Sequence, residues 1–297
     1  MHIRVALEAG VIALAATAWC GLSMGATAAQ PERVTFPSAD GKTTLVGYLF
    51  KPDPLPAPRV PAVVMMHGRG GAYSSRAKGV YDAAMLSQRH QAWGRLWAEA
   101  GYIAVLVDGF GPRGYPQGFP RFSYRDRPAE VDEVAIRPLD AYGALAYLRP
   151  RGDVQPDRIG LQGWSNGGSA ALSTMSADAP GIAAPSPSTG FRAALVFYPA
   201  CGLKGRFADG YRAYAPVRVF HGTKDEEVSA TRCRTFVETS RARGGDIEIR
   251  LYDGATHGFD DPSRKRQDVE ANAVATLDVI MRAQRFFATE LAGKARR

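Results

Sequence analysis

The chain has 297 residues, enough for one large α/β domain or two small ones. Its hydrophobic content of 45% and charged content of 22% are ordinary for a globular protein. Beyond the N-terminus the sequence has no run of about 18 or more apolar residues, so we expect no membrane span there. The 37 Lys and Arg against 29 Asp and Glu give a net charge of +8, but the basic residues are scattered, so we expect no nucleic-acid binding.

Residues 1–28 are typical of a secretory signal peptide. A short basic start, Met1–Arg4, precedes a mostly apolar run over Val11–Met24, and Ala26-Thr27-Ala28 supplies small residues for cleavage. An uncleaved membrane anchor is the alternative. We expect an exported protein, periplasmic or secreted, with no stable membrane span after the signal is removed.

Export determines how the three cysteines are interpreted. Cys20 leaves with the signal, so Cys201 and Cys233 remain as an even pair. An oxidising compartment permits a disulfide between them, which would close a loop of about 30 residues and stabilise the fold by on the order of 3 kcal/mol. Two unrelated thiols are the alternative, and we favour the disulfide.

Strand-like segments recur along the mature chain. Val34–Phe36 and Thr43–Phe50 flank the turn signal Asp40-Gly41 and predict an antiparallel hairpin. Arg158–Gln162 is a short strand, and Ile247–Tyr252 alternates polar with apolar residues as an edge strand does. Continuous apolar runs, typical of buried parallel strands, cover residues 61–66, 102–107, 193–197 and 217–220.

Helix-length segments separate these strands, at about Gln88–Glu99, Pro128–Leu148, Ser169–Ser176, Ser229–Arg243 and Gln267–Leu291. The alternation predicts one α/β domain over residues 29–297, with a mostly parallel central sheet, helices on both faces and the N-terminal antiparallel hairpin. The connection from Pro199 to Pro216 is too short for a large lid.

A G-x-S-x-G pentapeptide, Gly163-Trp164-Ser165-Asn166-Gly167, lies between a strand-like run and small residues suited to a buried helix. This spacing holds a serine on a tight strand-to-helix turn at the carboxyl edge of the sheet. Serine becomes a good nucleophile only when an imidazole takes its proton and a carboxylate orients that imidazole. Ser165, Asp225 and His257 occur in the chain order that accompanies this turn.

The other histidines and acids are weaker candidates. His67 and His221 precede glycine at strand ends and are interpreted as structural, and His90 as exposed. Glu226 and Glu227 are interpreted as solvated charges at a helix entry. Asp260 and Asp261 also lie near the base, but Asp225 is preferred because it occupies the turn after a strand.

Two backbone N–H groups are expected to form an oxyanion hole, those of Asn166 and of Arg69 in the glycine-rich turn after His67. The connection Gly109–Arg127 is long and rich in aromatic residues and arginines. It is either a wall of the acyl pocket or a surface loop held by its own aromatics. Trp164, Phe110 and Arg113 are the candidate substrate contacts.

With these motifs the chain resembles the dienelactone hydrolase branch of the α/β-hydrolase superfamily, from about Val34 to the C-terminal helix. The motifs that carry the resemblance are 67–71, 108–114, 163–168, the run ending at Asp225, and 255–259. The resemblance implies Ser165 as nucleophile, Asp225 as orienting acid, His257 as base, and backbone donors at Arg69 and Asn166. The founding members use cysteine as nucleophile, so Ser165 favours a general serine esterase over activity on dienelactones.

The sequence therefore predicts a carboxylic-ester hydrolase that acts on small-molecule esters through an acyl-serine intermediate. A small peptidase or amidase using the same residues is one alternative, and a catalytically silent binding protein with this fold is another. The histidines lack the clustered spacing of a zinc site, and no dinucleotide fingerprint follows the first parallel strand, so we expect neither metal nor cofactor. The sequence does not indicate an oligomeric state.

Overall fold

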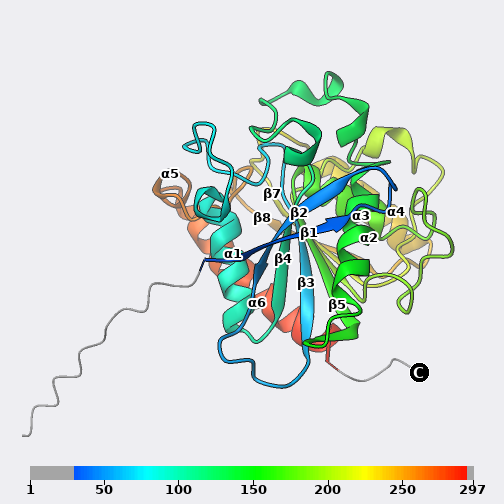
Figure 1. The fold of residues 1–297 in the computed structure, drawn as a ribbon. Coiled ribbons are helices and arrows are strands. Elements are labelled where there is room, and N and C mark those ends of the chain that lie inside the picture. The colour runs from blue at the N-terminus through cyan, green and yellow to red at the C-terminus, as the bar shows by residue number, and fades with distance from the viewer. Residues whose placement is uncertain (1–29, 293–297) are drawn as a thin grey trace, which may run out of the picture.

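The computed structural model describes residues 30–292, which are built around one eight-stranded sheet (Figure 1). From one edge to the other its strands run in the order β1-β2-β4-β3-β5-β6-β7-β8. β2 pairs antiparallel with both β1 and β4, and all other neighbours are parallel. The strands are β1 Glu32–Pro37, β2 Thr44–Phe50, β3 Val60–Met66, β4 Ile103–Asp108, β5 Val154–Trp164, β6 Ala194–Phe197, β7 Val217–Gly222 and β8 Ile247–Tyr252.

The central strands are apolar on both faces because both faces are covered. Along β3, Val64 and Met66 belong to one hydrophobic cluster, while Val63 and Met65 belong to the other. Successive side chains of a strand point to opposite faces, so a strand between two layers of helices needs apolar residues at every position. The continuous apolar run predicted for this segment follows from that burial.

Helices cover the two faces of the sheet separately (Figure 1). Leu145, Leu172 and Val237, from three different helices, share one cluster, and Trp97 and Phe287 share the other. The helices of the first face are α2 Arg137–Leu148, α3 Asn166–Thr174 and α4 Ala230–Ala242, and those of the second are α1 Gln88–Glu99 and α6 Glu270–Glu290. The predicted fold class, a mostly parallel sheet between helices with an N-terminal antiparallel hairpin, is confirmed.

Two predicted helices are shorter than expected. The predicted helix over 128–148 starts only at Arg137, because Pro138 is tolerated in the first turn of a helix but not in its interior. The predicted helix over 267–291 is α6, which starts at Glu270, and a separate short helix, α5 Arg264–Gln267, precedes it. Short 3-10 helices are η1 Ala83–Met85, η2 Gly111–Arg113, η3 Ser123–Arg125, η4 Ala129–Val131 and η5 Leu203–Gly205.

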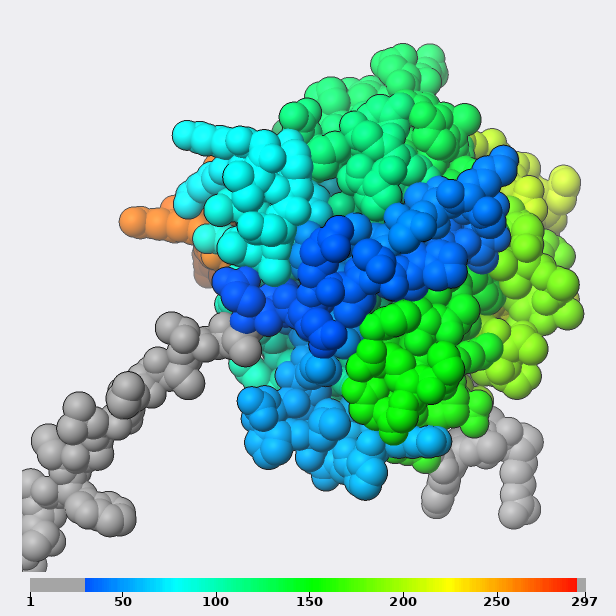
Figure 2. Space-filling view, viewed as in Figure 1, coloured from blue at the N-terminus to red at the C-terminus, as the bar shows by residue number. Residues whose placement is uncertain are grey.

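The long connection after β4 covers the end of the molecule at the top of Figure 2. The carboxyl ends of parallel strands form one edge of a sheet, where the loops that follow them meet. The predicted signal peptide, residues 1–28, lies outside the described residues. Within the described part, no helix has both the length and the apolar character needed to cross a membrane.

Candidate active site

Three side chains from three different strand ends meet at the carboxyl edge of the sheet. Ser165 follows β5, Asp225 follows β7 and His257 follows β8. His257 Nε2 lies 2.9 Å from Ser165 Oγ, and His257 Nδ1 lies 2.8 Å from Asp225 Oδ2. The Asp225 side chain is fully buried and that of His257 is 8% exposed. The imidazole thus bridges a hydroxyl and a carboxylate in a site largely shielded from water.

The turn that carries Ser165 is tight, and its backbone is strained. Ser165 has φ 52°, in the left-handed region that residues other than glycine rarely adopt. A Cβ atom on Gly163 would lie 2.2 Å from the Gly167 carbonyl oxygen, and one on Gly167 would lie 2.1 Å from that of Met66. Backbone segments touch at both places, so only glycine fits. The helix α3 then starts at once, three residues earlier than predicted.

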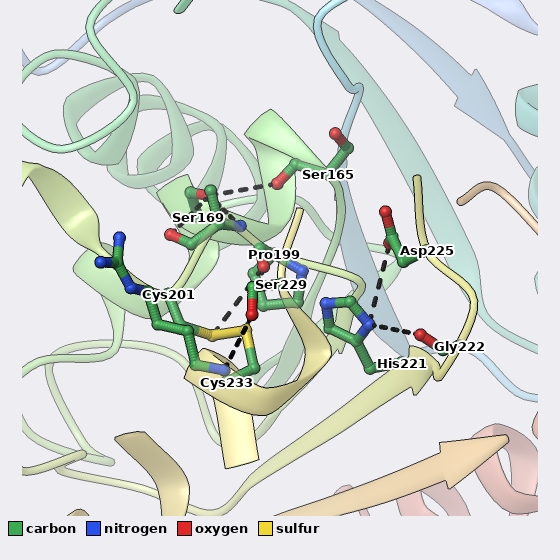
Figure 3. The surroundings of a disulfide bond; sticks show 11 residues. Ser165, Ser169, Pro199, Cys201, His221, Gly222, Asp225, Ser229 and Cys233 are labelled. Carbon is green, nitrogen blue, oxygen red and sulfur yellow. Dashed lines mark hydrogen bonds and ion pairs between the residues drawn. A yellow bond between two sulfur atoms is a disulfide. The ribbon is translucent and has the colours of Figure 1, made fainter. Parts of the chain in front are cut away.

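Asp225 is held by the turn in which it lies. Its Oδ1 accepts hydrogen bonds from the backbone N–H groups of Glu227, at 2.8 Å, and Val228, at 2.9 Å. This leaves Oδ2 to accept from His257 Nδ1. His221 Nδ1 is also 3.7 Å from Oδ2, and Figure 3 marks this contact with a dashed line. Burial, however, lowers the pKa of His221 and favours its neutral form.

The two predicted oxyanion donors lie on segments that flank Ser165. Asn166 is the first residue of α3, where backbone N–H groups have no partner within the helix. Its side chain is fixed from both sides, since Arg137 Nη1 donates to Oδ1 at 2.5 Å and Nδ2 donates to Glu133 Oε2 at 3.0 Å. The turn that carries Arg69 contacts the serine turn: a Cβ on Gly68 would lie 3.4 Å from Ser165 Cβ. Their role as oxyanion donors stays a prediction.

The other histidines are structural, although one differs from expectation. His67 Nδ1 lies 2.7 Å from the Gly68 carbonyl oxygen, and its Nε2 accepts from the Gly109 N–H at 3.2 Å. His67 is buried, which lowers its pKa well below the usual value. His90 was predicted to be exposed, but it is only 3% exposed and its Nδ1 bonds the Ala72 carbonyl oxygen. Burial lowers the pKa of His90 to about 4.

The three predicted substrate contacts are corrected, because these side chains are buried in the structure. Trp164 and Phe110 are fully buried, and Trp164 Nε1 donates to Asp260 Oδ2 at 2.8 Å. The Arg113 side chain is 5% exposed and forms an ion pair with Asp140 at 2.8 Å. None of the three is among the residues that line the cavity beside Ser165. These residues lie close to strand ends, as predicted, but their positions in the chain do not show whether their side chains face the core or the cavity.

Of the two glutamates that follow Asp225, Glu226 is exposed as predicted, although it is paired with Arg121 and Arg266. The interpretation of Glu227 as a solvated charge is corrected. Glu227 is 8% exposed and forms ion pairs with Arg69 at 2.8 Å and Arg121 at 2.7 Å. Burial alone would raise the pKa of Glu227, but the hydrogen bond from Arg69 and the neighbouring positive charges lower it to about 2. Glu226 Oε2 accepts the His257 N–H at 2.9 Å. The sequence carried no signal for these partners.

A cavity of about 610 Å³ opens beside Ser165. Its walls come from the end of the 109–127 connection, from the loop after β6 and from the start of α4. The charged residues that line it are Arg69, Arg125, Asp126, Arg127, Glu133, Lys204, Glu227 and Arg232. The prediction that the connection walls the pocket therefore fits its last residues, whereas Phe110 lies in the core. A larger groove of about 780 Å³ runs along β8 and α6, away from Ser165.

Within residues 30–292, no three or more His, Cys, Asp or Glu side chains are grouped so that they could hold a metal ion. The expectations of no metal and no cofactor stay predictions.

The predicted disulfide between Cys201 and Cys233 is present, with the two Cα atoms 5.0 Å apart. Cys201 lies in the loop after β6 and lines the cavity, and Cys233 lies in α4. Figure 3 shows the disulfide in the same neighbourhood as Ser165. The Ala200 N–H also donates to Ser169 Oγ at 3.0 Å, which ties this loop to α3. The disulfide therefore joins a wall of the cavity to the helix that follows Asp225.

Replacing both cysteines by serine is expected to lower the free energy of unfolding by roughly 3–4 kcal/mol, because the bond spans 32 residues and restricts the unfolded chain. Urea denaturation of the Cys201→Ser/Cys233→Ser variant and the wild type measures the difference. Reduced wild-type protein should match the variant. Equal unfolding midpoints for the variant and the oxidised wild type would contradict the prediction.

Comparison with known proteins assigns the sequence to a family. The sequence pattern of the dienelactone hydrolase family matches residues 45–291, which is most of the chain. The chain is also 31% identical to human (Homo sapiens) dipeptidyl peptidase 8 over 150 residues, 49% of this chain and 15% of that protein. It is 27% identical to a probable 2-oxo-3-(5-oxofuran-2-ylidene)propanoate lactonase of Bradyrhizobium sp over 171 residues, 54% of this chain and 64% of that protein. The matched region thus spans less than two thirds of either relative.

Among solved structures, the chain is similar to Thermogutta terrifontis esterase 2. The form phosphorylated by paraoxon matches with a TM-score of 0.63 and 22% identity, over 90% of this chain and 97% of that one. The propionate-bound form matches with a TM-score of 0.61, 22% identity and the same coverage. At this level of identity the similarity shows a shared fold.

Proposed function

The chain belongs to the dienelactone hydrolase family, and from that premise we propose that it is a serine hydrolase that cleaves carboxylic esters through an acyl-serine intermediate. One observation supports this above all others. The imidazole of His257 lies between Ser165 Oγ, at 2.9 Å, and Asp225 Oδ2, at 2.8 Å. A hydroxyl, an imidazole and a carboxylate in this order are what nucleophilic catalysis by serine requires.

In the proposed first half-reaction, Asp225 accepts a hydrogen bond from the N–H at His257 Nδ1, which keeps the ring proton there and leaves Nε2 free to act as a base. His257 Nε2 takes the hydroxyl proton while Ser165 Oγ attacks the ester carbonyl carbon. The carbonyl oxygen becomes an oxyanion, which the N–H groups of Asn166 and Arg69 stabilise. The imidazolium then gives its proton to the leaving alcohol, and the acyl group stays on Ser165.

The second half-reaction repeats these roles with water. His257 Nε2 removes a proton from a water molecule that attacks the acyl carbon, and the second tetrahedral intermediate uses the same two donors. Its collapse releases the carboxylic acid and returns the proton to Ser165 Oγ. Each group therefore acts twice, and no group outside this set is needed to balance the reaction.

We propose small esters as substrates, since the cavity beside Ser165 is about 610 Å³. Five of its lining side chains, Arg69, Arg125, Arg127, Lys204 and Arg232, are cationic and three, Asp126, Glu133 and Glu227, are anionic. The balance favours neutral and anionic substrates over cationic ones.

A peptidase or amidase is the second candidate, and the 31% identity to dipeptidyl peptidase 8 is the observation in its favour. That match covers 49% of this chain, whereas the dienelactone hydrolase match covers residues 45–291. Paired substrates with the same acyl group and either an ester or an amide bond distinguish the two. We expect a higher kcat/KM for the ester, and a higher value for the amide would reverse the order.

We further propose that the protein is exported. The composition of residues 1–28 and the Cys201–Cys233 disulfide both fit an oxidising compartment outside the cytoplasm. N-terminal sequencing of the protein purified from the periplasm or the medium should find a chain that begins near residue 29. A chain that keeps residues 1–28 would contradict the proposal.

A fluorophosphonate probe tests the function directly, because it reacts with an activated serine. We expect the wild type to be labelled at Ser165 and to hydrolyse short-chain esters. A folded wild-type protein that is neither labelled nor active would favour the remaining alternative, a catalytically silent binding protein with this fold.

A further inference from the structure

Outside the Ser165, His257 and Asp225 set, a second carboxylate faces the imidazole. Glu227 Oε2 lies 3.8 Å from His257 Nε2, on the side of the ring that faces Ser165, and both side chains are 8% exposed. We propose that Glu227 is a positioning residue of the active site, which stabilises the His257 imidazolium and holds the Arg69 turn and the 109–127 connection in place around it. This inference rests on the proposed function and adds a residue to it.

Glu227 holds Arg69 with two parallel hydrogen bonds. Arg69 Nε donates to Oε2 at 2.8 Å and Arg69 Nη2 donates to Oε1 at 3.0 Å. A bidentate pair of this kind fixes the orientation of the guanidinium as well as its distance. Because the backbone of Arg69 carries one predicted oxyanion donor, the pair ties that donor to the turn that carries Asp225. The ion pair between Glu227 and Arg69 thus connects the predicted oxyanion donor to the turn of Asp225.

Glu227 also holds the connection that walls the cavity. Arg121 Nε lies 2.7 Å from Glu227 Oε1, and Arg121 Nη2 lies 2.8 Å from Glu226 Oε1. The same connection is bound to the Arg69 turn, since the Phe119 N–H donates to the Arg69 carbonyl oxygen at 2.8 Å and Arg69 Nη1 donates to the Phe119 carbonyl oxygen at 3.0 Å. Three segments far apart in the sequence therefore meet at one carboxylate.

The charges around His257 determine the sign of the electrostatic effect. Asp225 contacts Nδ1, and Glu226, paired with Arg266 at 3.2 Å, accepts the backbone N–H. Glu227 is the carboxylate nearest to Nε2 and lies between it and the guanidinium of Arg69. The other groups near the ring are the Tyr198 ring, His221, and the Arg89 ion pairs with Asp260 and Asp261. When Nε2 takes the serine proton, the positive charge appears next to Glu227, which favours it.

The substitution Glu227→Gln removes the charge and keeps the shape. Histidine Cε1–H signals followed by NMR against pH, with the His257 signal assigned by its loss in His257→Gln, give the pKa of the imidazole in each variant. We expect the His257 signal to titrate at a lower pH in Glu227→Gln than in the wild type, because one nearby opposite charge is lost. We also expect kcat for a short-chain ester to fall by about tenfold with KM little changed, because oxyanion alignment acts in the transition state.

The second variant, Glu227→Asp, keeps the charge but shortens the side chain. It should leave the imidazole pKa near the wild-type value and still lower kcat, which separates the electrostatic role from the positioning role. If Glu227→Gln does not fold, Glu227→Asp still tests the positioning role, because an unchanged kcat in that variant would contradict it. Glu248→Gln is the matched control, because Glu248 is exposed on β8 and pairs with Arg218 away from the site. The control should leave both readouts unchanged.

An unchanged His257 pKa and an unchanged ratio of kcat to KM in Glu227→Gln would overturn the proposal, even if the variant were less stable. A fall in the His257 pKa in Glu227→Asp that equals the fall in Glu227→Gln would overturn it too, since distance and not charge would then matter. The titration does not require turnover. A wild type without esterase activity would therefore count against the proposed function, while the NMR result would still decide the role of Glu227.

Discussion

Ser165→Ala is expected to abolish hydrolysis, with kcat falling by about five to six orders of magnitude. The reason is that Ser165 Oγ is the hydroxyl in contact with His257 Nε2, so its removal takes away the nucleophile that the imidazole activates. The fold should remain, because Ser165 Oγ contributes a hydrogen bond only to His257 Nε2, at 2.9 Å, and the backbone of residue 165 keeps its hydrogen bond to Phe197. Active-site titration, kcat for a short-chain ester and thermal unfolding measure the three parts of this prediction.

Ser188→Ala is the matched control for this experiment. Ser188 lies in an exposed loop and bonds Ser186, so its loss should change neither activity nor fluorophosphonate labelling. If Ser165→Ala kept more than about a thousandth of the wild-type kcat, catalysis would have to proceed by general base attack of water or at another serine. Mass spectrometry of the labelled wild type would then identify the residue that reacts.

Asp225→Asn is expected to lower kcat by about four orders of magnitude while leaving the protein folded. Asp225 Oδ1 accepts two backbone N–H groups, so an asparagine would keep its carbonyl oxygen there and turn its NH₂ group toward His257 Nδ1. Nδ1 must then accept a hydrogen bond, which moves the ring proton to Nε2. A protonated Nε2 faces Ser165 Oγ as a donor and can no longer act as the base.

The control is Asp253→Asn, in the loop before His257. Asp253 is exposed and bonds Thr223 Oγ1 at 3.0 Å, so the exchange leaves the imidazole untouched and should leave kcat unchanged. The two variants should unfold at similar temperatures. Near wild-type activity in Asp225→Asn would contradict the role of Asp225 as the acid that orients the imidazole.

Sequence patterns predicted most strands of the sheet and the turn that carries the serine. The buried strands β3, β4, β6 and β7 were predicted to within two residues, because a strand covered on both faces must be apolar throughout. The serine turn was recognisable because backbone contact at Gly163 and Gly167 excludes every side chain. The helices were less well predicted where a proline in the first turn, Pro138, marked the start of a helix and not its interior.

The direction of side chains and the partners of charged groups were not predictable in the same way. Trp164 and Phe110 lie next to the site in the chain, yet both are fully buried. His90 has a polar sequence environment, but it is buried against the Ala72 carbonyl oxygen. Glu227 and Arg69 are 158 residues apart, and no local pattern relates them.

The amino-acid sequence by itself determined which segments become strands and where the serine turn lies. These features depend on the spacing of apolar residues and glycines that are close together in the chain. Only the tertiary structure shows that Glu227 faces the imidazole, that Arg113 forms a buried ion pair with Asp140, and which residues line the cavity. These features depend on the order of strands in the sheet, which brings loops together that are distant in the chain.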